Sequence, residues 1–114
     1  MDIINILAAL ISIGFGVIGW LMPKYTLEVL NLKGYTDTMG MSEIRASGGA
    51  LFIGMGLGAI ILGTPAAYAM IGFCWLGASI GRITSIALDG ATRKKIGFFA
   101  VEIAVAVIVL AINL

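Results

Sequence analysis

Five charged side chains lie within or beside the apolar runs of this chain and could do chemistry there: Glu43, Arg45, Arg82, Asp89 and Glu102. An unpaired charge inside a membrane span costs at least about 2.5–3.5 kcal/mol, so such residues need partners. Two acids and two bases predict an ion-paired cluster, and Asp89, at the end of its run, is interpreted as a loop or cap group beside it. The cluster would either fix helix register or form a proton, anion or lipid-headgroup site.

The depths of these charges follow from how the runs fold back on one another. The second and third runs form a hairpin that brings Glu43, Arg45 and Arg82 within about two helical turns of each other. The next hairpin places Glu102 within about one residue of level with Arg82. A glutamate is too short to reach the headgroups easily, whereas an arginine can. We therefore expect a direct Arg82–Glu102 pair facing the interior, with Glu43 and Arg45 nearer the membrane surface.

The rest of the composition argues against enzyme chemistry. The sequence has no histidine and one cysteine, Cys74, so no Ser-His or Cys-His catalytic set can form within it. The usual zinc and haem ligand sets are missing as well. We expect no catalytic residue, no metal and no cofactor, and the net charge of +1 gives no reason to expect nucleic acid.

Four apolar runs must position the charges. The chain is 61% hydrophobic and 11% charged, whereas a soluble domain is about half apolar and a quarter charged. A bilayer core needs about 20 helical residues, and the runs 3–22, 42–62, 65–88 and 96–112 are of that order. They are apolar all round, which disfavours a soluble bundle. The prediction is one all-α domain over 1–114, an integral membrane four-helix bundle.

The connections carry recognisable stop and start signals. Pro23 ends the first run, and 24–32 is too short and polar to span, so it is predicted to be an interfacial helix. Glycine favours a helix C-terminus, threonine the N-cap and proline the first helical position. The other connections are interpreted as a polar loop at 33–40, a corner at Gly63-Thr64-Pro65, and a basic loop at 91–95 that follows Asp89-Gly90.

The basic residues predict an orientation. In a four-span arrangement all of them fall on one side, while the termini and the 63–64 corner lie on the other. Basic residues favour the cytoplasmic side, so both termini are expected in the periplasm. The residues are Lys24, Lys33, Arg45, Arg82, Arg93, Lys94 and Lys95.

Glycines recur at four-residue spacing in the second and third spans, at Gly54, Gly58, Gly77 and Gly81. Small residues at this spacing allow helix backbones to approach closely in lipid. They are expected at helix contacts, either within the monomer or in a homo-oligomer.

Several of these motifs together resemble a known family. The segment Ser42-Glu43-Ile44-Arg45-Ala46-Ser47-Gly48-Gly49, followed by Gly81-Arg82 and Asp89-Gly90, is similar to an uncharacterised bacterial family, domain of unknown function 4345. Pro23 and Glu102 fit the likeness, which covers nearly the whole chain. The resemblance implies a four-helix bundle in a bacterial inner membrane, and it implies no activity.

These observations favour a non-enzymatic structural or accessory subunit of a membrane assembly, partnered by the lipid bilayer and by copies of itself or a larger complex. The alternative is a small transporter, channel or protein that binds lipid or a hydrophobic ligand through the Arg/Glu cluster. An enzyme subunit that contributes a quinone or lipid pocket is a third class. The sequence names no cargo and no partner.

Overall fold

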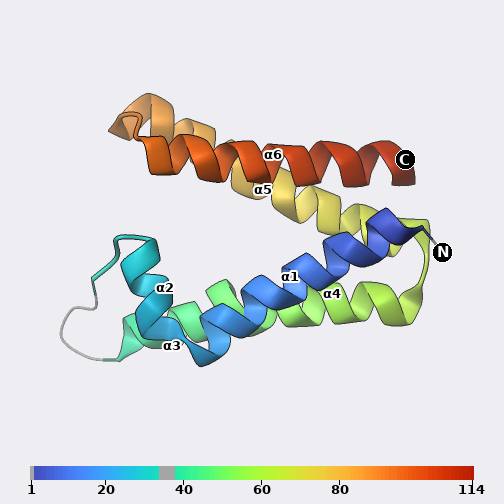
Figure 1. Cartoon of the computed structure of the whole chain (residues 1–114), viewed down its shortest axis with the longest axis horizontal. Coiled ribbons are helices and arrows are strands. Elements are labelled where there is room, and N and C mark those ends of the chain that lie inside the picture. Colours follow the sequence, from blue (N-terminus) through green and yellow to red (C-terminus); the bar gives the residue numbers. More distant parts are fainter. Residues whose placement is uncertain (1, 34–37) are drawn as a thin grey trace. The chain divides into compact units, whose positions relative to one another are not determined.

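The computed structural model describes residues 2–33 and 38–114, and within these residues it is helical, with no strand (Figure 1). The prediction of an all-helical chain is confirmed. Part of the polar loop expected at 33–40, residues 34–37, lies outside the described residues. The helices are α1 (Ile3–Leu21), α2 (Pro23–Val29), α3 (Met39–Arg45), the π-helical turn η1 (Ala46–Ala50), α4 (Leu51–Leu62), α5 (Pro65–Asp89) and α6 (Arg93–Asn113).

Four of the helical segments are long and apolar enough to cross a membrane: Ile3–Leu21, Met39–Leu62, Pro65–Asp89 and Arg93–Asn113. The second segment runs through α3, η1 and α4 without a break. The expected four spans are therefore present as helices, and the short helix expected after the first one is α2.

One predicted loop is wrong. The residues Arg93, Lys94 and Lys95 were expected in a loop, but they form the first turn of α6. The reason is the N-cap: the hydroxyl of Thr92 accepts a hydrogen bond from the backbone N–H of Lys95 at 3.2 Å, which satisfies one of the free donors at the helix start. The ammonium of Lys95 donates to the carbonyl of Gly90 at 2.8 Å.

Residue contacts divide the chain into two compact units. One consists of Ala9–Ile61, and the other contains the first residues of α1 together with Leu62–Leu114. The single domain expected over 1–114 stays a prediction, because each unit is defined by itself.

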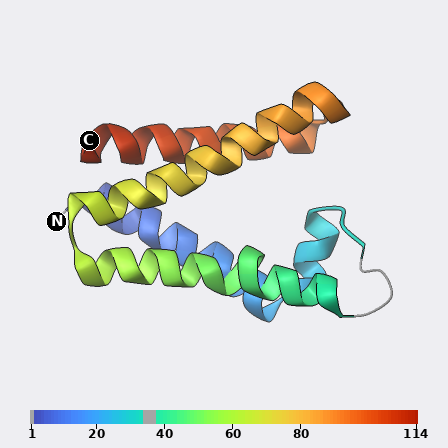
Figure 2. The same cartoon turned by 180° about the vertical axis from the view of Figure 1, so that it is seen from behind.

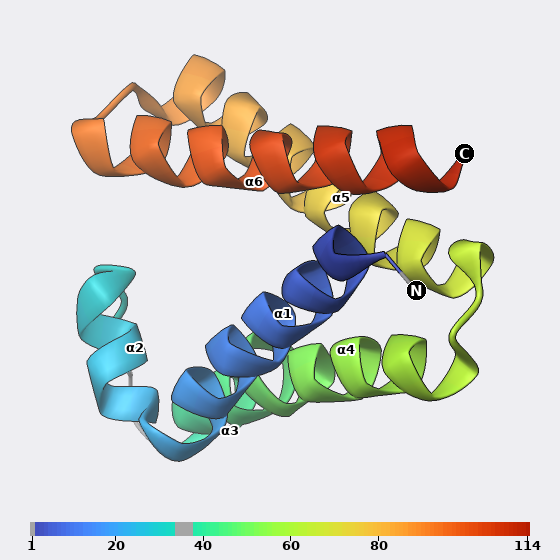
Figure 3. The ribbon, with the colours of Figure 1, turned by 45° about the vertical axis from the view of Figure 1, so that its right-hand side comes forward.

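In the unit Ala9–Ile61, α1 lies against η1 and α4 (Figure 3). The contact is made by backbone against backbone: a β-carbon at Gly16 would lie 2.7 Å from the carbonyl oxygen of Gly49, and one at Gly56 would lie 2.5 Å from that of Ala9. A β-carbon at Gly19 would collide with the carbonyl of Gly48. Only glycine permits this approach, as in other close helix pairs.

In the second unit, α5 and α6 pack as an antiparallel pair (Figure 2). Gly72 of α5 accommodates Leu110 of α6, whose Cγ would lie 2.8 Å from an added β-carbon. Gly90, with φ of 98°, ends α5. The buried apolar residues of these two helices are Tyr68, Ala69, Ile71, Trp75, Ala106 and Val109.

The corner before α5 follows the sequence prediction. Gly63 has φ of 65°, a conformation that glycine adopts without strain. The hydroxyl of Thr64 accepts a hydrogen bond from the N–H of Ala67 at 3.2 Å, and Pro65 begins the helix. Pro23 likewise begins α2, where its missing N–H removes no helix bond.

Candidate functional site

The centre of the site is an ion pair between α5 and α6. Arg82 donates from Nε to Oε1 of Glu102 at 3.1 Å and from Nη2 to Oε2 at 3.0 Å. Such a two-bond pairing matches the planar guanidinium to both carboxylate oxygens. Glu102 is only 8% exposed. The expected direct Arg82–Glu102 contact is therefore present in the structure.

The ring of Phe98 also contacts Arg82, whose side chain remains 31% exposed. The guanidinium carbon lies 5.1 Å from the centre of that ring, within the range of a cation–π contact. Phe98 and Glu102 are four residues apart on α6, so they share one face of the helix. Arg82 is held by this face through both its charge and its flat surface.

The local sequence explains why these residues meet. α5 ends at Asp89 and α6 begins at Arg93, so the connection is too short for anything but an antiparallel pair. Arg82 and Glu102 each lie about two to three helical turns from this connection, and hence at similar heights. The hydrogen-bonding groups of the buried side chains among the described residues all have partners.

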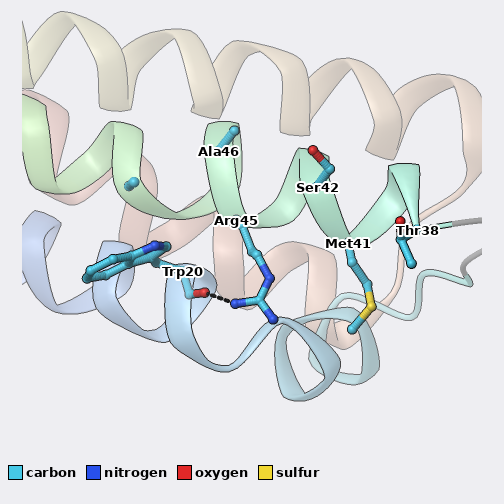
Figure 4. A pocket seen from close by; sticks show the side chains of 7 residues that line it. Trp20, Thr38, Met41, Ser42, Arg45 and Ala46 are labelled. Carbon is cyan, nitrogen blue, oxygen red and sulfur yellow. Dashed lines mark hydrogen bonds between the residues drawn. The ribbon is translucent and has the colours of Figure 1, made fainter.

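Glu43 and Arg45 belong to the other unit, where each has a partner of its own. Nη1 of Arg45 donates to the carbonyl oxygen of Trp20 at 2.7 Å (Figure 4). The last carbonyls of a helix lack N–H partners and attract cations, and Pro23 shortly after the end of α1 removes one more donor. The hydroxyl of Ser47 donates to the backbone carbonyl of Glu43 at 2.8 Å and approaches its carboxylate at 3.5 Å. A single cluster containing all four charges stays a prediction.

Asp89 forms a local contact. It is the last residue of α5, and its carboxylate accepts a hydrogen bond from the hydroxyl of Ser85, one turn earlier, at 3.0 Å. This geometry agrees with its interpretation as a group at a helix end.

The four glycines predicted at helix contacts are not among those that make close contacts inside the units. A β-carbon added at Gly54, Gly58, Gly77 or Gly81 would meet no described heavy atom outside its own stretch of helix within 4 Å. The close contacts inside the units are made by other glycines instead. Packing of these four glycines within the monomer and packing between copies both stay predictions. The glycines that do make close contacts are Gly16, Gly19, Gly49, Gly56 and Gly72.

Sequence reasoning missed an amide pair between α1 and α6. The side chain of Asn5 donates to Oδ1 of Asn113 at 2.9 Å, and Nδ2 of Asn113 donates back to Oδ1 of Asn5 at 2.7 Å. The same Nδ2 reaches the carbonyl of Val109 at 2.7 Å. A signal was available: these are two amides in apolar helices, near the two chain ends that a four-span topology places on one side.

The described residues contain no group of three or more His, Cys, Asp or Glu side chains that could hold a metal ion. Cys74 is exposed on α5 and forms no disulfide.

The comparisons with known proteins agree with the motifs. No curated protein and no solved structure matches the chain significantly. The family model described as "Domain of unknown function (DUF4345)" matches residues 1–112, nearly the full length. The segment 42–49, the Arg82–Glu102 pair and Asp89-Gly90 all lie within the match. The chain therefore belongs to the family of domain of unknown function 4345.

Proposed function

We propose that this protein is a multi-pass protein of a bacterial inner membrane and acts there as a non-enzymatic structural or accessory subunit. Four helices of sufficient length and apolar character support membrane insertion. All basic side chains fall on one side of a four-span arrangement, which favours periplasmic termini. Its partners are the bilayer and either further copies of itself or the subunits of a larger complex.

The observation that carries the proposal is the closed form of the Arg82–Glu102 pair. Both carboxylate oxygens of Glu102 are bonded by the arginine of the neighbouring helix. A proton or ion site would have to break these bonds in every cycle, at the cost of exposing a charge to low dielectric. A pair that stays closed instead fixes the register of α5 against α6.

The rival class is a small transporter, channel or lipid-binding protein that uses the same pair. The two classes differ in what happens when both charges are removed together. The variant Arg82→Met with Glu102→Leu leaves no stranded charge, so it should fold. A structural subunit keeps its partners in this variant, whereas a protein that moves or binds ions through the pair loses its activity although it folds.

The test compares the wild type with this double variant, each purified gently from native membranes. We expect mass spectrometry to identify the same co-purified proteins, or the same homo-oligomer, in both samples. We also expect proteoliposomes of the wild type to show no proton or ion flux above empty liposomes. Flux that the double variant abolishes would refute the structural role and establish the transporter class.

A further inference from the structure

A second charged site lies at the end of α1, in the unit Ala9–Ile61. Two hollows adjoin there, of about 490 Å³ and about 360 Å³, and Arg45 and Met41 line both. Both are open hollows of the surface and not enclosed cavities. Trp20 and Ala50 line the larger hollow, and Lys24 lines the smaller one.

The fold fixes the position of Arg45 between these hollows. The π-helical turn η1 begins at the next residue, and its Gly49 packs on the backbone of Trp20, 2.5 Å from an added β-carbon to the backbone nitrogen. Such turns are uncommon and occur often at functional sites. The close approach brings Arg45 to the carbonyl of Trp20, which takes one of its N–H groups (Figure 4). A guanidinium has five N–H donors, so others remain for a ligand.

The charged residues that line the hollows favour an anionic ligand. Among the described residues, Arg45 and Lys24 are the charged ones that line them, both basic and both exposed, and none of these lining residues is acidic. The nearest described acids along the same elements are Glu43, which accepts from Ser47, and the exposed Glu28 of α2. Asp37, next to Thr38 in the sequence, lies outside the described residues. An arginine with free N–H groups and a neighbouring lysine suit a phosphate.

The surroundings point to a lipid rather than to a free phosphate. Trp20, Leu21 and Met22 are 46%, 57% and 50% exposed beside the hollows, at the end of a helix apolar enough to cross a membrane. Tryptophan, tyrosine and basic residues gather where the bilayer meets water, and Tyr25 also lines the smaller hollow. Basic residues at this level attract anionic lipids.

We infer that Arg45, with Lys24, binds the phosphate of an anionic phospholipid headgroup, while Leu21, Met22 and Met41 contact the apolar part next to it. This inference rests on the proposed membrane insertion and is independent of the Arg82–Glu102 pair. A failure of lipid binding therefore leaves the structural role of that pair untouched, and the reverse also holds.

The experiment titrates the full chain in detergent with phosphatidylglycerol or phosphatidylcholine and counts bound lipids by native mass spectrometry. We expect phosphatidylglycerol to bind at least about tenfold more tightly, because both lipids carry a phosphate but the choline cation cancels the net negative charge, whose attraction is on the order of 1 kcal/mol per basic residue. Arg45→Gln should abolish this preference, and Lys24→Gln should reduce it. The matched control is Arg93→Gln, which removes the same charge from the other unit and should bind as the wild type does.

Two outcomes would overturn the inference directly: equal binding of the two lipids by the wild type, or undiminished phosphatidylglycerol binding by Arg45→Gln. Displacement of phosphatidylglycerol by moderate inorganic phosphate would show a free-phosphate site and contradict the lipid assignment. If circular dichroism shows that Arg45→Gln does not unfold cooperatively, a second variant, Ala50→Phe, tests the site instead. Its larger side chain fills the larger hollow while Arg45 is kept. It should weaken phosphatidylglycerol binding relative to the control Leu51→Phe, and equal binding by these two variants would refute the site.

Discussion

Phe98 and Glu102 lie one helical turn apart on α6 and contact the same guanidinium, that of Arg82 on α5. One side chain satisfies the charge of the arginine, and the other covers its flat face. This arrangement joins two helices that are each apolar enough to cross a membrane, and its strength can be measured directly.

Removal of one member of the ion pair should destabilise the protein strongly. Arg82→Met strands the buried Glu102 in low dielectric and should lower the free energy of unfolding by about 3–5 kcal/mol. Glu102→Leu should cost less, because the side chain of Arg82 is 31% exposed and an arginine can extend towards the headgroups. The double variant should recover much of this loss, because no charge is left unpaired. Unfolding in mixed micelles with increasing sodium dodecyl sulfate, followed by circular dichroism, gives the four values of the cycle. Losses that simply add would disprove the coupling.

The contribution of the aromatic ring can be separated from that of the charge. Phe98→Leu keeps an apolar side chain but removes the ring that faces Arg82, and it should cost about 0.5–2 kcal/mol. Phe99→Leu is the matched control, because it makes the same change one residue away, where the described residues provide no cation contact. A larger loss of stability for Phe99→Leu than for Phe98→Leu would show that the lost side-chain volume, and not the cation–π contact, determines the effect.

The amide pair offers a second coupling measurement. Asn5→Leu should leave the amide of Asn113 short of a partner, at a cost of about 1–3 kcal/mol. Asn113→Leu should have a similar effect on Asn5. Because the apolar replacements suit each other, the double variant should be less destabilised than the sum of the two single ones. Strict additivity in the same unfolding assay would indicate that the pair does not form in solution.

Alanine substitutions at Gly49 and at Gly58 should change the stability of the protein in opposite directions. Gly49→Ala places a methyl group 2.5 Å from the backbone nitrogen of Trp20, so it should destabilise the contact between α1 and η1. At Gly58 an added methyl group meets no described atom within 4 Å, and alanine improves helix propensity by up to about 1 kcal/mol. Melting temperatures in detergent test both. If Gly58→Leu leaves the melting temperature unchanged but alters the sedimentation of the protein, Gly58 lies at a contact between two copies of the chain.

The orientation of the termini can be tested in intact cells. A periplasm-active reporter fused after Leu114 should be active, because the basic residues favour the cytoplasmic side for the opposite ends of the helices. In a Cys74→Ser background, Thr92→Cys should be protected from a membrane-impermeant thiol reagent added outside. Labelling of this cysteine from outside would contradict the predicted topology. A cysteine at Thr36 serves as a second probe: this residue, in the 33–40 loop that is expected on the same side of the membrane, lies outside the described residues.

The sequence predicts the spans and the Arg82–Glu102 contact well for physical reasons. Apolar length sets each helix, Gly63, Thr64 and Pro65 set one turn, and the short connection after Asp89 sets the other. Once α5 and α6 are antiparallel, two opposite charges at one height in an apolar environment must pair. The first turn of α6 was missed because its basic residues resemble a loop, although Thr92 can cap a helix regardless of the charges that follow.

The glycine contacts could not be obtained from spacing. Gly54 and Gly58 show the regular four-residue pattern, whereas the close contacts are made at Gly16, Gly19 and Gly49. A regular stripe says which residues share a face, but the partner helix decides which face is used. Around η1 the usual period does not apply at all, since the N–H of Leu51 reaches the carbonyl of Ala46, five residues back.

The π-helical turn has a consequence for insertions and deletions. Its backbone hydrogen bonds span five residues instead of the four of an α-helix, so the helix from Met39 to Leu62 contains in effect one inserted residue. A one-residue deletion from a uniform α-helix rotates everything before it by about 100° around the axis. Deletion of Ser47 from this wide turn would instead restore a uniform α-helix and leave Arg45 close to its present direction towards Trp20. The helix from Met39 to Leu62 can therefore lose a residue at η1 without redirecting this guanidinium, whereas the same deletion within Leu51–Leu62 would turn it away.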